Sequence, residues 1–213
     1  MQEESSETDT TARAVVCSEN AEGSIKDMWT GDFGLTRWII LRHDGTGVLL
    51  GGRQFILDIS MDFKWQVLDS GFDQPFHLGP TIPRTPILLA EFRLQLDFDA
   101  TTPGAVKLDG KDTITERRTG PFKQRDPGPR VFAVRLERGY FTPKESSSGL
   151  SPCHYELRLV FEPSPYGTKQ EWDGIDDYME TDGYWDDKAF VARQCPSPPA
   201  GILPHIQDNC VVS

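Results

Sequence analysis

The chain of 213 residues is poor in the residues on which metal sites, disulfide frameworks and glycosylation depend. It has four cysteines and four histidines, and no C-x-x-C or H-x-x-x-H spacing occurs among them. Such spacings bring ligands together locally, so neither a zinc site nor a disulfide framework is expected. The two asparagines, Asn20 and Asn209, begin no N-x-Ser/Thr acceptor sequence. We therefore expect reduced thiols and no metal or other cofactor.

The chain also lacks long apolar runs and an excess of positive charge. Lys and Arg number 22 against 33 Asp and Glu, which gives a formal net charge of -11. Nucleic-acid affinity depends on clustered positive charge, so a nucleic-acid partner is not expected. No stretch has the apolar length of a membrane helix, and the first ten residues are acidic where a signal peptide is basic. These features predict a cytoplasmic protein.

The sequence patterns of common catalytic sites are missing as well. No G-x-S-x-G occurs, so serine hydrolysis is not indicated. The glycines between residues 45 and 52 lie in an expected hairpin with no helix after it, which excludes a phosphate-binding loop. The five acidic residues Asp173, Asp176, Asp177, Glu180 and Asp182 lack the D-x-D-x-D-G order of a calcium loop. A solvated acidic face is therefore a simpler interpretation than a calcium site.

The strongest positive signal is an alternation of apolar and polar residues with a period of two. Every odd position from Phe55 to Trp65 is large and apolar, and Asp44-Gly45 before this stretch predicts a tight hairpin turn. The same alternation recurs over 87–98, 131–140 and 154–162. We expect strands at 35–42, 46–50, 55–68, 87–98, 111–118, 131–140, 153–162 and 188–193.

About eight to nine strands with hardly a helix predict an all-β fold, an antiparallel β-barrel or, as the alternative, a sandwich. The expected domain spans residues 25–193. Residues 1–24 are acidic and nearly free of large apolar groups, so they are predicted to be a disordered tail, and 194–213 a Pro-rich flexible tail. The Pro-rich stretch 69–86 is interpreted as an ordered loop over the barrel if Phe72, Phe76 and Leu78 pack. The aromatic residues of the acidic stretch 163–187 are expected to anchor a loop or short helix on the outside of the barrel.

Three sequence patterns resemble a known family. They are W-x-G-x-F-G-x-x-R-W-x-x-L-x-x-D-G-T-G-x-L from Trp29 to Leu49, F-x-L-x-I-x-M-D-F-x-W from Phe55 to Trp65, and F-x-P-S-P-Y from Phe161 to Tyr166. Together they resemble the small lipocalin-like, calycin-type proteins of filamentous fungi. The resemblance implies a lipocalin-like β-barrel.

Some of these fungal proteins are pericyclases of secondary metabolism, which suggests a function for this chain. The expected function is a cyclase or isomerase that works without a cofactor on a hydrophobic polyketide or terpenoid intermediate, for example by a Diels–Alder or hetero-Diels–Alder cyclisation. The alternative is a non-catalytic, lipocalin-like module that binds a small hydrophobic ligand. In either case the expected partner is a small hydrophobic molecule.

The side chains that face into such a barrel form either a solid core or a cavity for an apolar molecule, and the sequence leaves both open. Catalysis there would hold reactive groups in near-attack geometry while a few donors polarise a carbonyl. The candidate catalytic donors are Arg37, Trp65 and Tyr155. Two further donors, Arg93 and His154, fall on the wetter strand face and are more simply surface residues. The candidate ligand-binding residues are Trp38, Phe55, Leu57, Met61, Phe63, Phe92, Leu94, Phe132, Val134 and Leu157.

The last four residues, Cys210-Val211-Val212-Ser213, match a farnesyl-type C-a-a-X box after a Pro-rich spacer. The alternative is a chance tail, because no basic stretch precedes the cysteine. A single lipid gives only reversible membrane binding. If Cys210 is prenylated, we therefore expect a peripheral contact with a cytosolic membrane face.

Overall fold

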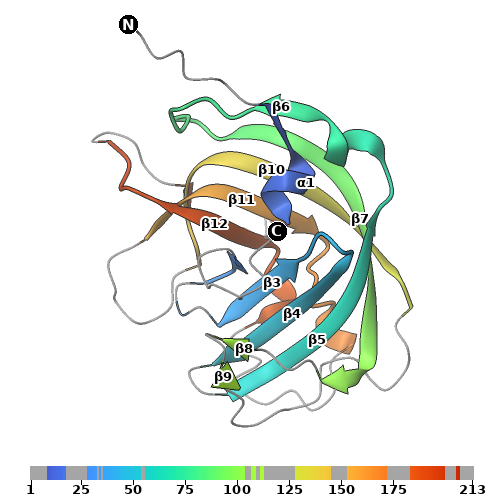
Figure 1. Ribbon diagram of the computed structural model, residues 1–213. Coiled ribbons are helices and arrows are strands. Elements are labelled where there is room, and N and C mark those ends of the chain that lie inside the picture. The colour runs from blue at the N-terminus through green and yellow to red at the C-terminus, as the bar shows by residue number, and fades with distance from the viewer. Residues whose placement is uncertain are drawn as a thin grey trace, which may run out of the picture.

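The computed structural model describes residues 9–17, 28–32, 34, 36–53, 56–103, 107–108, 111–112, 128–144, 153–171, 183–199 and 205–206. Eight antiparallel strands form a closed ring in the order β11-β12-β2-β3-β4-β5-β7-β10, and β10 pairs again with β11 (Figure 1). The ring strands are β2 (Trp29–Thr30), β3 (Arg37–Leu41), β4 (Thr46–Arg53), β5 (Ile56–Val67), β7 (Ile87–Pro103), β10 (Arg130–Thr142), β11 (His154–Glu162) and β12 (Ala189–Cys195). The prediction of an all-β, antiparallel fold is confirmed.

Shorter elements surround the ring. Outside it lie the strands β1 (Asp9–Thr11), β6 (Pro75–His77), β8 (Lys107–Leu108), β9 (Lys111–Asp112) and β13 (His205–Ile206). The described helices are α1 (Ala12–Val16) and the 3-10 turns η2 (Ser70–Asp73), η3 (Lys169–Glu171) and η4 (Tyr184–Asp186). β1 pairs with β6, β8 with β9, and β13 lies parallel to the end of β10.

The hairpin between β3 and β4 forms where Asp44-Gly45 predicts it. Gly45 has a φ of 81°, a conformation that glycine adopts without strain. The Asp44 carboxylate accepts hydrogen bonds from the Thr46 backbone N–H at 2.9 Å and the Thr46 hydroxyl at 2.7 Å. The turn chemistry of the sequence therefore sets the register of this hairpin, with Leu41 opposite Gly47.

The alternating pattern in β5 and β7 places one face of each strand inside the ring. In β5 the buried residues Met61, Phe63 and Trp65 alternate with the exposed Lys64 and Gln66. Residues 92–98 of β7 alternate in the same way. The predicted alternation fails at Leu88, whose side chain does not face the interior and is 55% exposed. The register between β7 and β10 shifts next to it, and such an irregularity turns the following side chains to the other face.

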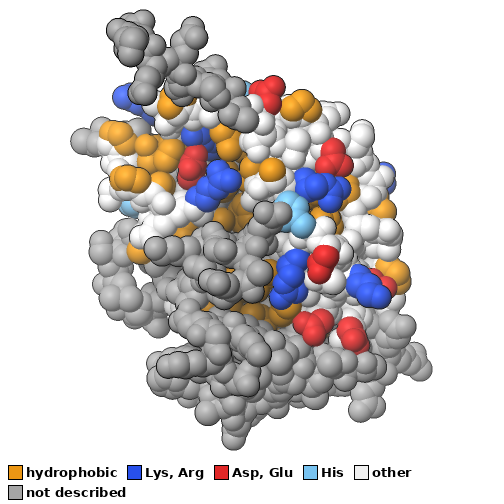
Figure 2. Space-filling view, in the orientation of Figure 1, with side chains coloured by type: hydrophobic (Ala, Val, Ile, Leu, Met, Phe, Trp, Pro, Cys, Tyr) orange, Lys and Arg blue, Asp and Glu red, His pale blue; other side chains and the backbone are white. Residues whose placement is uncertain are grey.

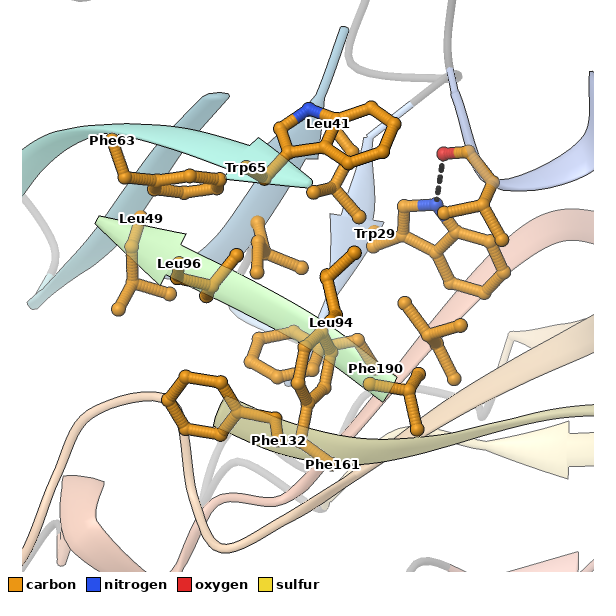
Figure 3. Packing of buried hydrophobic residues seen from close by; sticks show 14 of the residues in the cluster. Trp29, Leu41, Leu49, Phe63, Trp65, Leu94, Leu96, Phe132, Phe161 and Phe190 are labelled. Atoms are coloured by element: carbon orange, nitrogen blue, oxygen red, sulfur yellow. Dashed lines mark hydrogen bonds between the residues drawn. The ribbon is translucent and has the colours of Figure 1, made fainter. Parts of the chain in front are cut away.

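The inward side chains form one apolar cluster, which we call the interior cluster (Figure 3). Figure 3 shows aromatic and aliphatic side chains from several strands pointing toward a common centre. Neighbouring rings meet edge to face, with centroids 6.0 Å apart for Phe132 and Phe161 and 5.8 Å for Phe161 and Phe190. This geometry suits the charge distribution of aromatic rings. A smaller, separate outer cluster consists of Met28, Trp38, Val48 and Leu50, with Ile40 packed against it.

The predicted disorder of residues 1–24 is wrong for residues 9–17. Thr11 caps α1 by accepting a hydrogen bond from the Ala14 backbone N–H, and Ala12, Val15, Val16 and Cys17 belong to the interior cluster. The Val15-Val16 pair therefore buries enough apolar surface, together with its neighbours, to order this short segment. Residues 1–8 and 18–27 lie outside the described residues.

The structure also moves two boundaries that the sequence predicts near the C-terminus. β12 extends to Cys195, beyond the expected domain end at 193, and residues 205–206 of the predicted flexible tail pair with β10. The backbone hydrogen bonds available at these strands explain both extensions. Of the expected strand 111–118, residues 111–112 form β9 and the rest lies outside the described residues.

The surface of the described part carries mixed charge. Lys and Arg side chains lie among Asp and Glu on the face shown in Figure 2, with no large region of one sign. Within the described ranges, no helix has both the length and the apolar character needed to cross a membrane.

Candidate functional site

The ring has two ends, one at the turn of the β3–β4 hairpin and one at the opposite end of these strands. Different residues close the interior at each end. The indole N–H of Trp65 donates to the carbonyls of Arg42 and Thr46 at 3.1 and 3.0 Å, which places Trp65 at the turn. The hydroxyl of Tyr184 donates to the carbonyl of Gly52 at 3.0 Å, near the other end of β4, where Arg37 begins β3. We call the end of the ring near Trp65 the α1 end, and the end near Tyr184 and Arg37 the polar end.

The polar end contains a buried ion pair. Arg37 Nε lies 2.8 Å from Asp187 Oδ2, and the two side chains are 7% and 2% exposed. Lys144 Nζ donates to Asp187 Oδ1 at 3.2 Å. The Arg37 guanidinium also lies over the ring of Tyr184, with Cζ 4.8 Å from the ring centroid. One carboxylate therefore faces two cations in a site from which water is largely excluded.

Two buried tyrosines hold the polar end against β4. The Tyr166 hydroxyl donates to the carbonyl of Leu50 at 2.5 Å, as that of Tyr184 does to Gly52. Burial raises the pKa of Tyr166 well above its usual value, so this phenol stays protonated and keeps donating. A Cβ on Gly51 would lie 3.1 Å from Tyr184 Cε1 and 2.9 Å from Ile59 Cδ1, so glycine permits the close approach.

Backbone contacts fix the position of Asp187. Ser164 Oγ donates to the backbone carbonyl of Asp187 at 2.7 Å, and the Asp187 N–H donates to the carbonyl of Tyr184 at 3.0 Å, which closes the η4 turn. Asp32 holds the start of β3 by accepting from the backbone N–H groups of Thr36 at 2.8 Å and Arg37 at 3.3 Å. Both partners of the ion pair are thus held by the backbone around them.

The Asp187 carboxyl is the polar-end group whose protonation changes near neutral pH. Burial raises its pKa to about 6, although Arg37 and Lys144 oppose the change and Asp32 adds to it. A carboxyl of this kind can donate or accept a proton in the physiological range. The hydroxyl protons of Tyr166 and Tyr184 are already donated to β4 carbonyls, so the groups that could polarise an oxygen of a bound molecule are the Asp187 carboxyl and the Arg37 guanidinium beside it.

The α1 end is closed by a segment that is not part of the ring. α1 places its apolar side chains in the interior cluster, and the indole N–H of Trp29 donates to the carbonyl of Val16 at 3.0 Å (Figure 3). Arg13 donates through Nε to Asp73 Oδ1 at 2.8 Å. In Figure 1, α1 lies across the opening of the ring, next to β6 and β7.

Aromatic rings line the α1 end beneath this segment. Phe72 of η2 meets Trp65 with ring centroids 5.9 Å apart and Phe92 with centroids 4.7 Å apart, both in edge-to-face geometry. Phe72 is fully buried, and Phe76 and Leu78 pack against the interior cluster. The prediction that the 69–86 loop is ordered by these side chains is confirmed.

Most of the candidate ligand-binding residues lie together inside the ring. The interior cluster contains Met61, Phe63, Phe92, Leu94, Phe132, Val134 and Leu157. Trp38 lies in the outer cluster instead, because it alternates with Ile39 on β3. Phe55 and Cys210 fall outside the described residues, and Leu57 is described only as part of the β5 backbone.

The three candidate catalytic donors do not form one group. Arg37 lies at the polar end and Trp65 at the α1 end, where backbone carbonyls accept its indole N–H. Tyr155 is half-buried on β11 opposite Phe141 and Gln194, and burial raises its pKa. Of the further donors, Arg93 is exposed as expected, whereas His154 is buried, so the surface prediction is wrong for His154. It lies on β11 between two paired strands, directly opposite Cys195 of β12.

Sequence reasoning missed Tyr166, Tyr184 and Asp187. The expectation that the aromatic residues of 163–187 anchor a loop on the outside of the barrel is wrong for Tyr184, which belongs with Tyr166 to the interior cluster. In the sequence, Tyr184 and Asp187 stand in an aromatic and acidic stretch, which does not distinguish an inner from an outer face, and Tyr166 appears only as the end of the F-x-P-S-P-Y pattern. The five acidic residues considered for calcium fall between 172 and 182, outside the described part. Among the described residues, no group of three or more His, Cys, Asp or Glu is arranged to hold a metal ion.

Comparison with known proteins assigns no family: no protein-family model matches the chain, and neither curated proteins nor solved structures gave a significant match.

Proposed function

We propose that this chain is a lipocalin-like binding protein whose small hydrophobic ligand enters the ring interior at the α1 end. The observation that carries the proposal is the membership of Ala12, Val15, Val16 and Cys17 in the interior cluster. These side chains come from a segment outside the ring, yet they occupy the end of its apolar interior. An apolar ligand that takes their place would meet the same surroundings.

The α1 segment is suited to leaving this position. A helix of five residues is not stable alone, so α1 depends on its docking contacts. β1 and β6 are three residues long each, and the pair is held by few backbone hydrogen bonds. Segments held by few contacts open at a lower free energy than a central sheet does. The polar end, in contrast, is closed by buried polar contacts to β4, so entry is expected at the α1 end.

The proposal is tested by titrating the full chain with the neutral fluorescent probe N-phenyl-1-naphthylamine. Saturable binding is expected for the wild type. Leu94→Phe adds volume to the interior next to Phe132 and Val67, and should weaken binding about tenfold if it removes on the order of 1.4 kcal/mol. The matched control is Leu88→Phe on the exposed face of the same strand, which should bind as the wild type does.

Overpacking destabilises a core by about 1 to 3 kcal/mol, so the Leu94→Phe variant must be shown to be folded by circular dichroism and urea unfolding. The proposal fails if the wild type shows no saturable binding. It also fails if Leu88→Phe and Leu94→Phe weaken binding equally, because the probe would then bind elsewhere. Native mass spectrometry of the protein from its own host gives an independent reading of any ligand that it carries.

A second candidate function is the cofactor-independent cyclisation or isomerisation of a hydrophobic polyketide or terpenoid intermediate. The observation that favours it is the polar end, where the Asp187 carboxyl lies 2.8 Å from the Arg37 guanidinium beside an apolar interior and has a pKa of about 6. Such a cluster can polarise a carbonyl or move a proton in a substrate whose apolar part lies in the ring.

This candidate is tested in the host by removing the gene and restoring either the wild type, Asp187→Asn or the exposed control Glu162→Gln. Catalysis through Asp187 predicts that the wild type and Glu162→Gln restore the cyclised product, while folded Asp187→Asn leaves its precursor. Full restoration by Asp187→Asn would rule out a role for this carboxyl. No change of metabolites on gene removal would rule out the catalytic function.

A further inference from the structure

Arg13 of α1 occupies a small site with two aromatic walls and one acidic wall. Its guanidinium carbon Cζ lies 5.0 Å from the ring centroid of Phe72 and 5.9 Å from that of Trp65. Its Nε and Nη2 donate to the two carboxylate oxygens of Asp73 at 2.8 and 3.3 Å. Proteins recognise organic cations with this combination, because aromatic faces and a carboxylate all attract positive charge.

The cation and its surroundings come from different parts of the chain. Trp65 belongs to β5 and Phe72 and Asp73 to η2, whereas Arg13 belongs to the segment that closes the α1 end. The Arg13 and Asp73 side chains are 40% and 59% exposed. Ion pairs with such access to water are weak, so another cation can replace Arg13 at little cost. The hydrogen bond raises the pKa of Arg13 and lowers that of Asp73, so both groups stay charged in this contact.

We infer that Trp65, Phe72 and Asp73 form a binding site for the cationic group of an organic ligand, and that Arg13 is its internal occupant. The inference rests on the proposed ligand-binding function and names the ligand class. The apolar body takes the place of Ala12, Val15 and Val16, and an ammonium or guanidinium group takes the place of the Arg13 side chain. The preferred ligand is therefore a hydrophobic molecule with one positive charge.

The charges of the molecule support this preference. The formal net charge of -11 attracts a cationic ligand over long distances. Arg13 is hydrogen-bonded to the carboxylate of Asp73, which is exposed and keeps its charge. At the polar end the comparable carboxylate, Asp187, is buried and already faces Arg37 and Lys144. A ligand cation is therefore accommodated at the α1 end.

The experiment compares three ligands with the same tail: dodecyltrimethylammonium, dodecanol and dodecyl sulfate, each below its micelle concentration. Their affinities for the full chain are measured by displacement of N-phenyl-1-naphthylamine. The ratio of cation to dodecanol affinity is the readout, because it cancels the contribution of the tail. A cation–π contact with a carboxylate partner predicts that the cation binds about five- to tenfold more tightly than dodecanol, and the sulfate more weakly than either.

Two variants and two matched controls locate the preference. Asp73→Asn should lower the ratio several-fold, to the contribution of the two rings alone, while Asp97→Asn, which removes the same charge from an exposed position on β7, should leave it unchanged. Arg13→Ala empties the site and should raise the ratio several-fold. Arg135→Ala, at an exposed position on β10, should leave it unchanged.

The outcomes separate this inference from the function on which it rests. If dodecanol binds as tightly as the cation to the wild type, the hydrophobic site stands and the cation site is overturned. The same holds if Asp97→Asn and Asp73→Asn lower the ratio equally, because net charge would then cause the preference. If neither the fluorescent probe nor dodecanol binds, the proposed function itself fails.

Discussion

The two ends of the ring are closed in physically different ways. At the polar end, side chains next to β3, β11 and β12 make buried contacts, with Arg37 on Asp187 and two tyrosine hydroxyls on β4 carbonyls. At the α1 end, a separate segment adds four apolar side chains and one partly exposed ion pair. The polar end is thus closed by residues between β11 and β12 that buried polar contacts join to β3 and β4, whereas the α1 end is closed by an N-terminal segment with apolar contacts and one exposed ion pair.

Burial alone therefore does not predict which end of the ring opens more easily. Ala12 and Tyr184 are both fully buried. Losing a buried charge partner costs several kcal/mol, whereas displacing an apolar side chain costs nothing further if another apolar group takes its place. On the proposed function, the α1 end is therefore expected to exchange its contents more readily than the polar end.

The largest expected effect is at the polar end. Asp187→Ala leaves the Arg37 guanidinium buried without its closest anion and should lower the free energy of unfolding by about 3 to 5 kcal/mol. Urea unfolding followed by tryptophan fluorescence measures this change.

The control for that prediction replaces both partners. Arg37→Leu combined with Asp187→Leu should recover most of the lost stability, because neither member of the ion pair is then left buried without the other. Glu162→Ala breaks the exposed pair with Lys188 and should cost less than about 1 kcal/mol. Equal costs for Asp187→Ala and Glu162→Ala would contradict the buried character of the polar end.

The next largest effect is the pH dependence of the free energy of unfolding that Asp187 causes. The folded-state pKa of Asp187, about 6, lies above its ordinary value of 3.8, so the folded protein binds this proton more tightly than the unfolded chain does. Its contribution to stability is therefore present below pH 4, falls as the pH rises from 4 to 6, and stays lost above that. The expected loss is about 2 to 3 kcal/mol.

Comparison with Asp187→Asn isolates this group, because Asp44, Asp73 and Glu171 have lowered pKa values and act in the opposite direction. The difference in unfolding free energy between wild type and Asp187→Asn should change between pH 4 and 6. A difference that stays constant over this range would show that Asp187 titrates normally.

At the α1 end, Val16→Ala should have a moderate effect. Removing two buried methyl groups loses about 1.5 kcal/mol of docking free energy, so hydrogen exchange of residues 12–17 should speed up about tenfold. Val131→Ala, at a position that is 48% exposed, is the control and should leave exchange in this segment unchanged. If Val16→Ala accelerates exchange equally across all strands, the segment and the ring open as one unit.

The smallest expected effect is that of Arg13→Ala on stability. Its ion pair with Asp73 is open to water, so the free energy of unfolding should fall by less than about 1 kcal/mol. Urea unfolding at low and high salt measures the change, which should shrink further as salt screens the pair. A loss of several kcal/mol would mean that Arg13 is a structural anchor and not a replaceable occupant.

The sequence predicts the ring well because most of its strands carry the alternating pattern along their length. Phe63 and Leu94 face inward for this reason, and Asp44-Gly45 sets the first hairpin. The two-residue β2 and the reversal at Leu88 were not predictable from periodicity, since both depend on pairing with distant strands.

The ends of the ring are less predictable from the sequence than its wall. Tyr184 lies 132 residues from Gly52, whose carbonyl it contacts, and Arg13 lies 60 residues from Asp73. Neither contact follows a local period. Arg37 is among the predicted donors, but its partner Asp187 is one of many acidic residues in its stretch, and only the folded chain distinguishes it.

Hydrogen–deuterium exchange of the full chain, with and without N-phenyl-1-naphthylamine, tests most directly whether the interior is reached through the α1 end. The amides compared are those of residues 9–17 and those of the polar end, such as the Gly52 N–H bonded to the Thr36 carbonyl at 2.7 Å. The expected result is faster exchange in 9–17 than at the polar end, and a further increase in 9–17 alone when the probe binds. Equal exchange at both ends, or slower exchange in 9–17 on binding, would contradict entry at the α1 end.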